Sequence, residues 1–175
     1  MLNTELQQAE KNFLELVAKN QPRILRICRA YAWNPQDQED LYQEVLLQIW
    51  RSLSVLKDPA TASTWLYRVA LNTAISFVRK QAPRRDRVSA FSHEQIRQAA
   101  EQRQPAEEQD SAELAALYEV IAKLDGVEKA LITLFLEDLS YEEIAEVMGL
   151  NPGHVGVLLH RVKKKLSSLI HEVRT

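Results

Sequence analysis

The sequence predicts an all-α protein with two small helical domains joined by a flexible linker. Glycine is scarce, with 4 residues in a chain of 175. Apolar residues recur every three to four positions, as in amphipathic helices, whereas the alternating runs of Val, Thr and Ile that strands need are hard to find. A stretch rich in Gln, Glu and Pro separates two apolar regions, which indicates a linker between two cores.

The first region predicts two helices, over residues 4–19 and 22–33. We expect a break at Asn20 and Pro22, because Asn caps helix starts and Pro is tolerated in the first turn. Asn34–Pro35 ends the second helix. The side chains expected to point inward are Leu6, Phe13, Leu16, Val17, Ile24, Leu25, Ile27 and Cys28.

Two further helices follow in the first region. A helix from about residue 36 to 54 is predicted by an apolar stripe that repeats every four residues, formed by Leu41, Val45, Ile49 and Leu53. The next helix, capped by Thr61 or Ser63, is predicted to reach Lys80. Its inward side chains are expected to be Leu66, Val69, Ala70, Thr73 and Phe77.

The formal net charge of −2 combines segments of opposite sign. Residues 1–88 hold 13 basic and 9 acidic residues, residues 89–113 hold 2 and 6, and residues 114–175 hold 7 and 9. A basic first half is compatible with nucleic-acid binding, so the charge of the whole chain does not exclude it. We place the first domain at 1–88, an acidic linker at 89–112 and the second domain at 113–175.

The second domain begins with a predicted capping box at Asp110–Glu113. The helix that it opens is expected to turn Leu114, Leu117, Ile121 and Leu124 inward. Another helix is predicted over residues 127–137. A second capping box, Ser140 with Glu143, opens a short helix over residues 141–148.

The short helix and the residues after it predict a helix-turn-helix. Gly149 suits the left-handed position past a helix end, and Asn151 with Pro152 can start a longer helix that reaches about residue 170. The second helix of such a motif can lie in a major groove. The candidate contacts to DNA are Asn151, His154, Gly156, Val157, His160, Arg161, Lys163, Lys164 and Lys165. Packed helix pairs that never touch DNA, and solvated lysine runs, remain alternatives.

The helix between Trp65 and Arg79 is suited to single-stranded DNA. Unpaired bases stack on aromatic side chains, and an amide such as Asn72 can pair with a base edge in both directions. The candidate residues are Trp65, Arg68, Asn72, Ser76 and Arg79. The alternative is a core helix whose aromatic residues only pack.

Neither an enzyme nor a membrane protein is expected. Cys28 is the only cysteine, which excludes a disulfide framework and a cysteine-based zinc site, and we expect it to be buried. The histidines lack carboxylates at metal-ligand spacing, and no phosphate-binding Gly loop or activated nucleophile occurs, so no metal or cofactor is predicted. The longest apolar runs fall far short of the ~20 residues of a membrane span, so we expect a cytoplasmic protein.

Three segments occur in a characteristic order: Asp40–Trp50 (DLYQEVLLQIW), Thr64–Ala74 (TWLYRVALNTA) and Leu139–Leu150 (LSYEEIAEVMGL). Together they resemble the extracytoplasmic-function (ECF) sigma factors of bacterial RNA polymerase. The resemblance covers nearly the whole chain, with the linker in the expected place. It implies a transcription initiation factor without enzymatic activity of its own.

The resemblance also implies roles for the individual segments. Asp40, Gln43 and Glu44 match positions that dock on the clamp helices of core RNA polymerase. The helix from Trp65 to Lys80 and the loop before it resemble the elements that open and recognise the −10 promoter element. Residues 114–172 resemble the domain that binds the −35 element and the polymerase flap. The family further implies a dedicated anti-sigma factor as a partner.

Some residues depart from the family pattern. Ala62 stands where many members have Phe, and Gly156, Val157 and Leu158 stand where many have Lys, Ser and Arg. Because of these departures, two other functions remain alternatives to that of a sigma factor. One is a free-standing helix-turn-helix regulator, and the other is a sigma-like adaptor that binds polymerase without recognising DNA.

Overall fold

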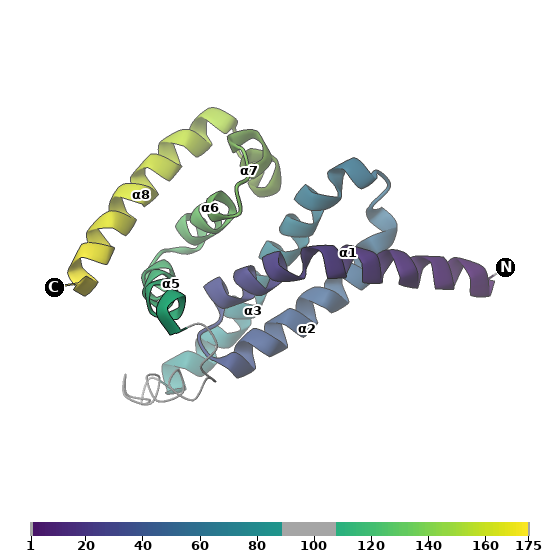
Figure 1. Ribbon diagram of the computed structural model, residues 1–175, viewed down its shortest axis with the longest axis horizontal. Helices are drawn as coiled ribbons and strands as arrows, with labels where there is room; N and C mark the ends of the chain where they lie inside the picture. The colour runs from purple at the N-terminus through teal and green to yellow at the C-terminus, as the bar shows by residue number, and fades with distance from the viewer. Residues whose placement is uncertain (1, 89–107, 175) are drawn as a thin grey trace.

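The computed structural model describes residues 2–88 and 108–174, which contain helices and turns but no strand. The N-terminal unit consists of α1 (Leu2–Tyr31), α2 (Pro35–Ser52) and α3 (Ala62–Val88), which pack on one another (Figure 1). The C-terminal unit consists of α5 (Glu108–Ala122), α6 (Gly126–Leu136), α7 (Tyr141–Met148) and α8 (Pro152–Arg174). The all-α prediction is confirmed for the described residues.

Helix α1 is continuous through Pro22, so the predicted break is wrong. Asn20 is buried and does not cap a new helix, because its Nδ2 donates to the carbonyl of Leu16 at 2.8 Å and its Oδ1 accepts from Arg23 at 3.2 Å. A proline inside a helix removes one backbone hydrogen bond. The apolar side of α1 continues past this point to the fully buried Ile24, which keeps the two predicted segments in one helix.

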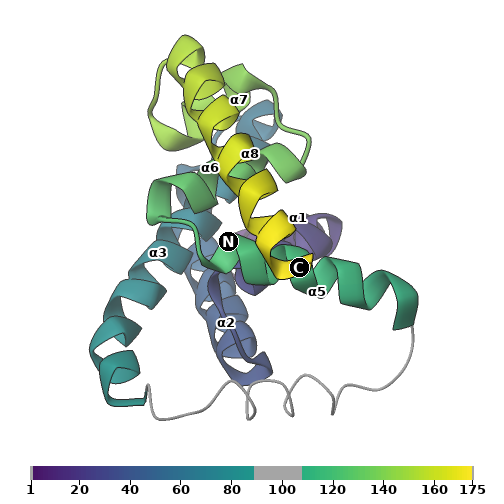
Figure 2. The same cartoon turned by 90° about the vertical axis from the view of Figure 1, so that its left-hand side faces the viewer.

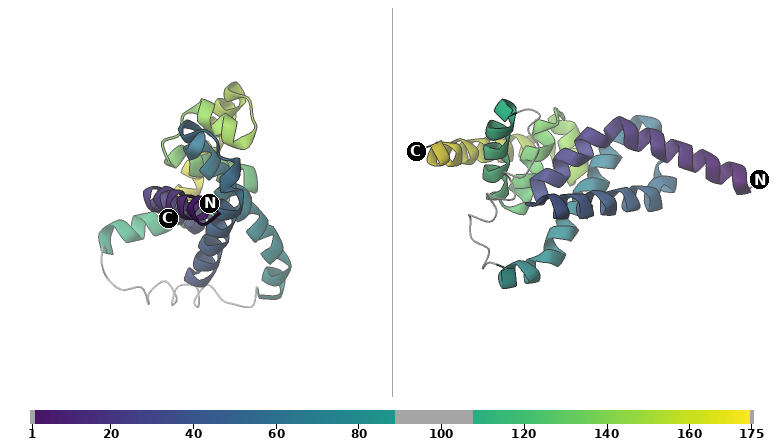
Figure 3. Two further views of the ribbon diagram at one scale, coloured as in Figure 1. Left: turned by 90° about the vertical axis from the view of Figure 1, so that its right-hand side faces the viewer. Right: turned by 60° about the horizontal axis from the view of Figure 1, so that its bottom comes forward.

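The first half of α1 projects beyond the rest of the N-terminal unit (Figure 3). Leu6, predicted to point inward, belongs to this first half of α1 and is 58% exposed. Leu25 was also expected inside and is 46% exposed. Phe13 marks the start of the packed part, where its ring meets the ring of Trp50 edge to face with the centroids 5.3 Å apart.

Helices α2 and α3 follow the predicted apolar stripes. The amide of Asp37 donates to Oδ1 of Asn34 at 2.8 Å, so Asn34 caps α2 as well as ending the preceding segment. The buried side chains of α2 are Leu41, Val45 and Ile49, as predicted, whereas Leu53 lies beyond the end of α2 and is half-buried. Of the side chains predicted inside on α3, Leu66, Ala70 and Thr73 are buried and Val69 and Phe77 are half-buried. The short 3-10 turns Leu53–Val55 and Pro59–Thr61 connect the two helices.

The boundaries around the predicted linker differ from the prediction. Helix α3 continues to Val88 instead of ending at Lys80, and α5 already begins at Glu108. Asp110 therefore lies inside α5 and cannot be its cap. Leu114 lies near the start of α5 and is 40% exposed instead of buried, whereas Ile121 and Leu124 are buried as expected. The rest of the predicted linker, 89–107, lies outside the described residues.

The helix-turn-helix has the predicted local structure. Ser140 caps α7 in the predicted reciprocal capping box with Glu143, and Asp125 caps α6 in a second box, with Glu128, that was not predicted. Gly149 ends α7 in the left-handed conformation, with φ of 68°. The core of the C-terminal unit is formed by Leu131, Leu134, Ile144, Val155 and Leu159, all fully buried.

The two units are packed together in this structure. Helix α7 lies against α3, and α5 and α6 lie against α1 (Figure 2). Cys28 of α1 is buried as predicted, and burial raises the pKa of its thiol to about 12. Among the described helices, none has the combination of length and apolar character that would let it cross a membrane.

Gly149→Ala is expected to destabilise the fold by about 1 kcal/mol, because an alanine at φ of 68° is strained. Gly126→Ala is the control, since Gly126 is the first residue of α6, lacks a positive φ and has space around a new Cβ. It should leave stability unchanged or raise it slightly. Urea unfolding of the three proteins measures the difference, and equal losses in both variants would contradict this account of the turn.

Candidate nucleic-acid interface

The start of α8 exposes the side chains expected to contact DNA. His154, Val157 and His160 are exposed on the surface of the helix-turn-helix, Val157 to 51%. Asn151 is exposed as well, and its Oδ1 accepts from the amide of Gly153 at 2.9 Å. The side-chain amide oxygen of Asn151 thus accepts a hydrogen bond at the start of α8.

Gly156 lies beside Tyr141 of α7. A Cβ at this position would lie 3.4 Å from the ring, which is close to an ordinary van der Waals contact. The contact alone therefore does not require a glycine in the second helix of the motif.

The basic residues of α8 point in different directions. The Lys163 ammonium lies 3.7 Å from the ring centroid of Phe135, and Lys165 forms an ion pair with Glu128 at 2.6 Å. Both side chains therefore contact residues of α6. Arg161 and Lys164 are exposed and follow His154 and Val157 at helical spacing. The exposed face of α8 therefore carries two cations beyond its first turn.

Helix α3 exposes a polar stripe opposite its buried one. Arg68, Asn72 and Arg79 are exposed, whereas Trp65 and Ser76 are half-buried at its side. The sequence analysis missed Ile75, which is 40% exposed and belongs to the same stripe. The spacing of Arg68, Asn72, Ile75 and Arg79 at i, i+4, i+7 and i+11 is the signal that identifies it. An apolar side chain between amide and guanidinium groups suits contact with a base face.

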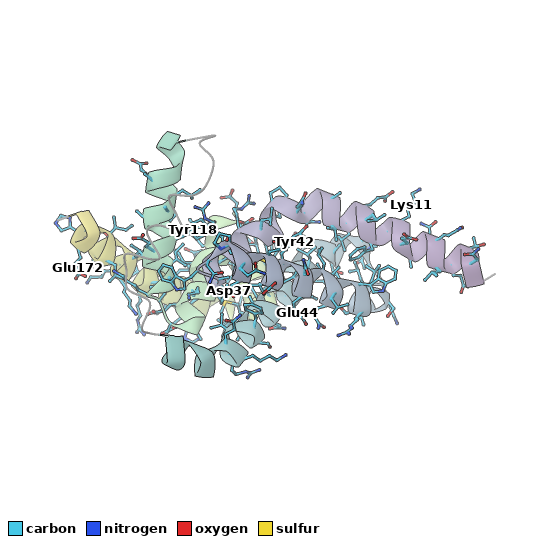
Figure 4. The ribbon with its side chains drawn as sticks, turned by 90° about the horizontal axis from the view of Figure 1, so that it is seen from below. Lys11, Asp37, Tyr42, Glu44, Tyr118 and Glu172 are labelled. Atoms are coloured by element: carbon cyan, nitrogen blue, oxygen red, sulfur yellow. The ribbon has the colours of Figure 1, made fainter. Side chains whose placement is uncertain are left out.

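Helix α2 exposes a third stripe. Asp40 and Gln43 are exposed, and Leu47, which the sequence analysis did not single out, continues the stripe with 40% exposure. Glu44 is only half-buried in the surface beside it, where it accepts a hydrogen bond from Gln48 at 2.9 Å. Figure 4 shows Glu44 along α2, on the side of the molecule away from α8. The three expected docking residues are thus close together but differ in accessibility.

Polar contacts connect the two units. The guanidinium of Arg26 on α1 donates from Nε and from a terminal nitrogen to the two carboxylate oxygens of Glu137, the latter at 2.7 Å. The hydroxyl of Tyr67 donates to the same carboxylate at 3.2 Å. Arg68 donates to the main-chain carbonyl of Glu146 on α7 at 2.6 Å. Thus Arg68, which is expected to contact DNA, forms a hydrogen bond with the C-terminal unit.

The charge state of Tyr67 fits its role as a donor. Burial, and next the negative charge of Glu137, raise the pKa of Tyr67, so the phenol stays protonated at neutral pH. Two cation–π contacts accompany these hydrogen bonds. Arg29 lies 4.6 Å from the ring centroid of Tyr118, and Lys129 lies 5.4 Å from that of Tyr31. In both pairs one partner comes from α1 and the other from the C-terminal unit.

The fold and these surfaces define a two-unit helical protein with a helix-turn-helix and a second exposed polar stripe on α3. Known families agree with this division. Residues 16–84 match the family Sigma-70 region 2, and residues 114–166 match Sigma-70, region 4. The two matches fall on the N-terminal and C-terminal units respectively.

Curated relatives extend the comparison to most of the chain. The ECF RNA polymerase sigma-E factor of Haemophilus influenzae is 31% identical over 94% of this chain and 91% of its own length. The RNA polymerase sigma factor SigV of Bacillus subtilis is 31% identical over 79% of each chain. The ECF sigma factor SigE of Mycolicibacterium smegmatis is 30% identical over 91% of this chain, which spans only 62% of that protein. The chain belongs to the ECF family of RNA polymerase sigma factors.

Solved structures show the same fold. The sigma factor RpoE of Bartonella quintana, in complex with the anti-sigma factor NepR, has a TM-score of 0.72 and 21% identity over 92% of this chain and 98% of its own. CnrH, in complex with the cytosolic domain of CnrY, has a TM-score of 0.65 and 24% identity over 95% of this chain and 94% of its own. Both likenesses are at the level of the fold.

Proposed function

We propose that this chain is a cytoplasmic transcription initiation factor that directs core RNA polymerase to promoter DNA and has no catalytic activity of its own. The observation that carries the proposal is the presence of three exposed stripes, on α2, α3 and α8, in a member of the ECF family. Residues 1–88 would bind polymerase and the −10 element, residues 89–112 would link the domains, and residues 113–175 would bind the −35 element.

The stripes have different chemistry, which supports different partners. The stripe on α2 combines Asp40 and Gln43 with the apolar Leu47, as in a protein–protein contact. The stripe on α3 combines guanidinium, amide and apolar groups, which suits unpaired bases and the backbone between them. The face of α8 carries His154 at its start and cations further on, which suits base edges followed by phosphates.

A dedicated anti-sigma factor is part of the proposal. Two of the solved structures with this fold are described as complexes, one with the anti-sigma factor NepR and one with the cytosolic domain of CnrY. A partner that binds both units would prevent the stripes from reaching polymerase and DNA. Run-off transcription with purified core polymerase on promoter templates tests the function, and a protein that binds duplex DNA alone without stimulating polymerase would contradict it.

Replacing Asp40 and Gln43 by Ala is expected to weaken binding to core polymerase by about tenfold, because both side chains are exposed on the docking stripe. The stability of the free protein should change by less than about 0.5 kcal/mol. Glu39→Ala is the matched control, since Glu39 faces the hollow beside Leu25 and Arg29 of α1. Titration with labelled polymerase measures affinity, and an equal effect of the control would remove α2 from the docking surface.

Asn72→Ala is expected to lower promoter-directed transcription and to relax preference at one position of the −10 element. Amide contacts and stacking with unpaired bases each contribute on the order of 1–3 kcal/mol. Asn12→Ala removes the same group from the exposed surface of α1 and should have no effect. Run-off assays on a set of −10 variants measure the preference, and wild-type preference at every position would make Asn72 a structural residue.

Lys164→Ala is expected to lower the salt slope of log affinity for −35 DNA by roughly 0.9 without changing sequence preference, as removal of one phosphate contact does. Lys163→Ala should lower it less, because its ammonium lies over the ring of Phe135. His154→Ala should change preference and leave the slope nearly constant. Salt titrations of holoenzyme on −35 variants measure both quantities, and no change in any variant would favour the adaptor function.

A further inference from the structure

The carboxylate of Glu137 lies in a basic patch of the other unit. Its side chain is 3% exposed, although it directly follows α6 at the molecular surface. Both of its oxygens accept hydrogen bonds from the guanidinium of Arg26, and one also accepts from Tyr67. The N-terminal unit therefore binds the carboxylate of Glu137 as an anion, through donors of Arg26 and Tyr67.

The donors around Glu137 continue onto the stripe of α3. Arg68 follows Tyr67 in sequence and donates to the carbonyl of Glu146, so both acceptors belong to the C-terminal unit. Arg23 adds a further positive charge, with its guanidinium carbon 5.9 Å from the ring centroid of Tyr67. The patch therefore joins the end of α1 to the beginning of the proposed DNA-binding stripe.

We propose that Arg26, Tyr67 and Arg68 form a binding site for the phosphates of single-stranded DNA, and that Glu137 occupies this site when the two units are packed together. This inference rests on the proposed role of α3 in binding single-stranded DNA. A planar guanidinium binds carboxylate and phosphate with the same pair of parallel hydrogen bonds, and a phenol can donate to either anion. The charge of the patch matches a nucleic-acid backbone that runs along Asn72 and Arg79.

The packed arrangement covers only part of the DNA-binding surface. Arg26 and Arg68 are engaged by the C-terminal unit, whereas His154, Arg161 and Lys164 of α8 remain exposed. The packed protein would therefore present its −35 surface while its site for single-stranded DNA is occupied. Separation of the units frees the patch for the backbone of a melted strand.

Two substitutions that break the same ion pair distinguish a binding site from a structural contact. Glu137→Gln and Arg26→Gln are both expected to separate the units in the free full-length protein, and small-angle scattering would measure this as a larger radius of gyration. Glu137→Gln is expected to bind fluorescent oligothymidine about tenfold more tightly, because the competing anion is gone. Arg26→Gln is expected to bind it no better than the wild type, with a salt slope roughly 0.7 smaller than that of Glu137→Gln.

Charge-matched controls exclude a general electrostatic effect. Glu128→Gln breaks the ion pair with Lys165 inside the C-terminal unit, and Lys11→Gln removes an exposed cation of α1. Both should leave the radius of gyration unchanged and alter oligothymidine affinity only slightly. Affinity changes of the same sign in the two ion-pair variants, changes no larger than those of the controls, or an unchanged radius in both would overturn the proposal.

Two further measurements separate the possible causes of failure. Binding of polyglutamate but not of oligothymidine by Glu137→Gln would assign the patch to an acidic protein segment and overturn the DNA assignment. Run-off transcription by the wild-type protein with core polymerase tests the proposed function separately. A promoter-specific transcript without the opposite behaviour of the ion-pair variants would refute the phosphate site alone.

Discussion

The burial of one apolar stripe on each helix is the constraint that places the functional side chains. Leu41, Val45 and Ile49 bury one side of α2, which leaves Asp40 and Gln43 in solvent on another. Helices α3 and α8 follow the same pattern, so each can carry polar groups in a straight row without disturbing its core. The stripes can therefore vary in sequence while the fold stays the same.

The contact between the units combines apolar and polar groups. The buried apolar side chains of both units belong to one core cluster, and the contact also includes the hydrogen bonds of Glu137 and Glu146 and two cation–π pairs. Hydrogen bonds to charged groups contribute about 1.5–3 kcal/mol each, and cation–π contacts about 0.5–2 kcal/mol. Water can replace the polar part of this contact when the units separate, whereas the apolar part must be exposed.

Local features of the sequence predicted the helix-turn-helix well, because the capping box of Ser140 with Glu143 and the turn at Gly149 act within a few residues. The prediction failed where tertiary packing outweighs a local signal. Pro22 costs one hydrogen bond, but the buried side of α1 continues past it, and Asp110 lies in a helix that starts earlier. The pairing of Arg26 with Glu137 joins residues 111 positions apart, and no local pattern connects them. Ile75 and Leu47 follow the exposed polar residues of α3 and α2 at helical spacing, so the sequence does carry a signal for them.

The position of Glu137 connects the fold to the order of events at a promoter. A contact of a few kcal/mol would keep most molecules in the closed form, in which the units are packed together. A ligand shifts this equilibrium toward the open form if it binds the open form more tightly by at least the same free energy. The proposed docking of α2 on polymerase would not require the covered residues, because Asp40 and Gln43 are exposed while the units are packed together. At the proposed phosphate site, by contrast, a single strand would compete directly with Glu137. Separation of the two units would therefore be coupled more strongly to the melting of DNA than to the docking of α2 on polymerase. Only the melted strand would replace the hydrogen bonds that Glu137 forms with Arg26 and Tyr67.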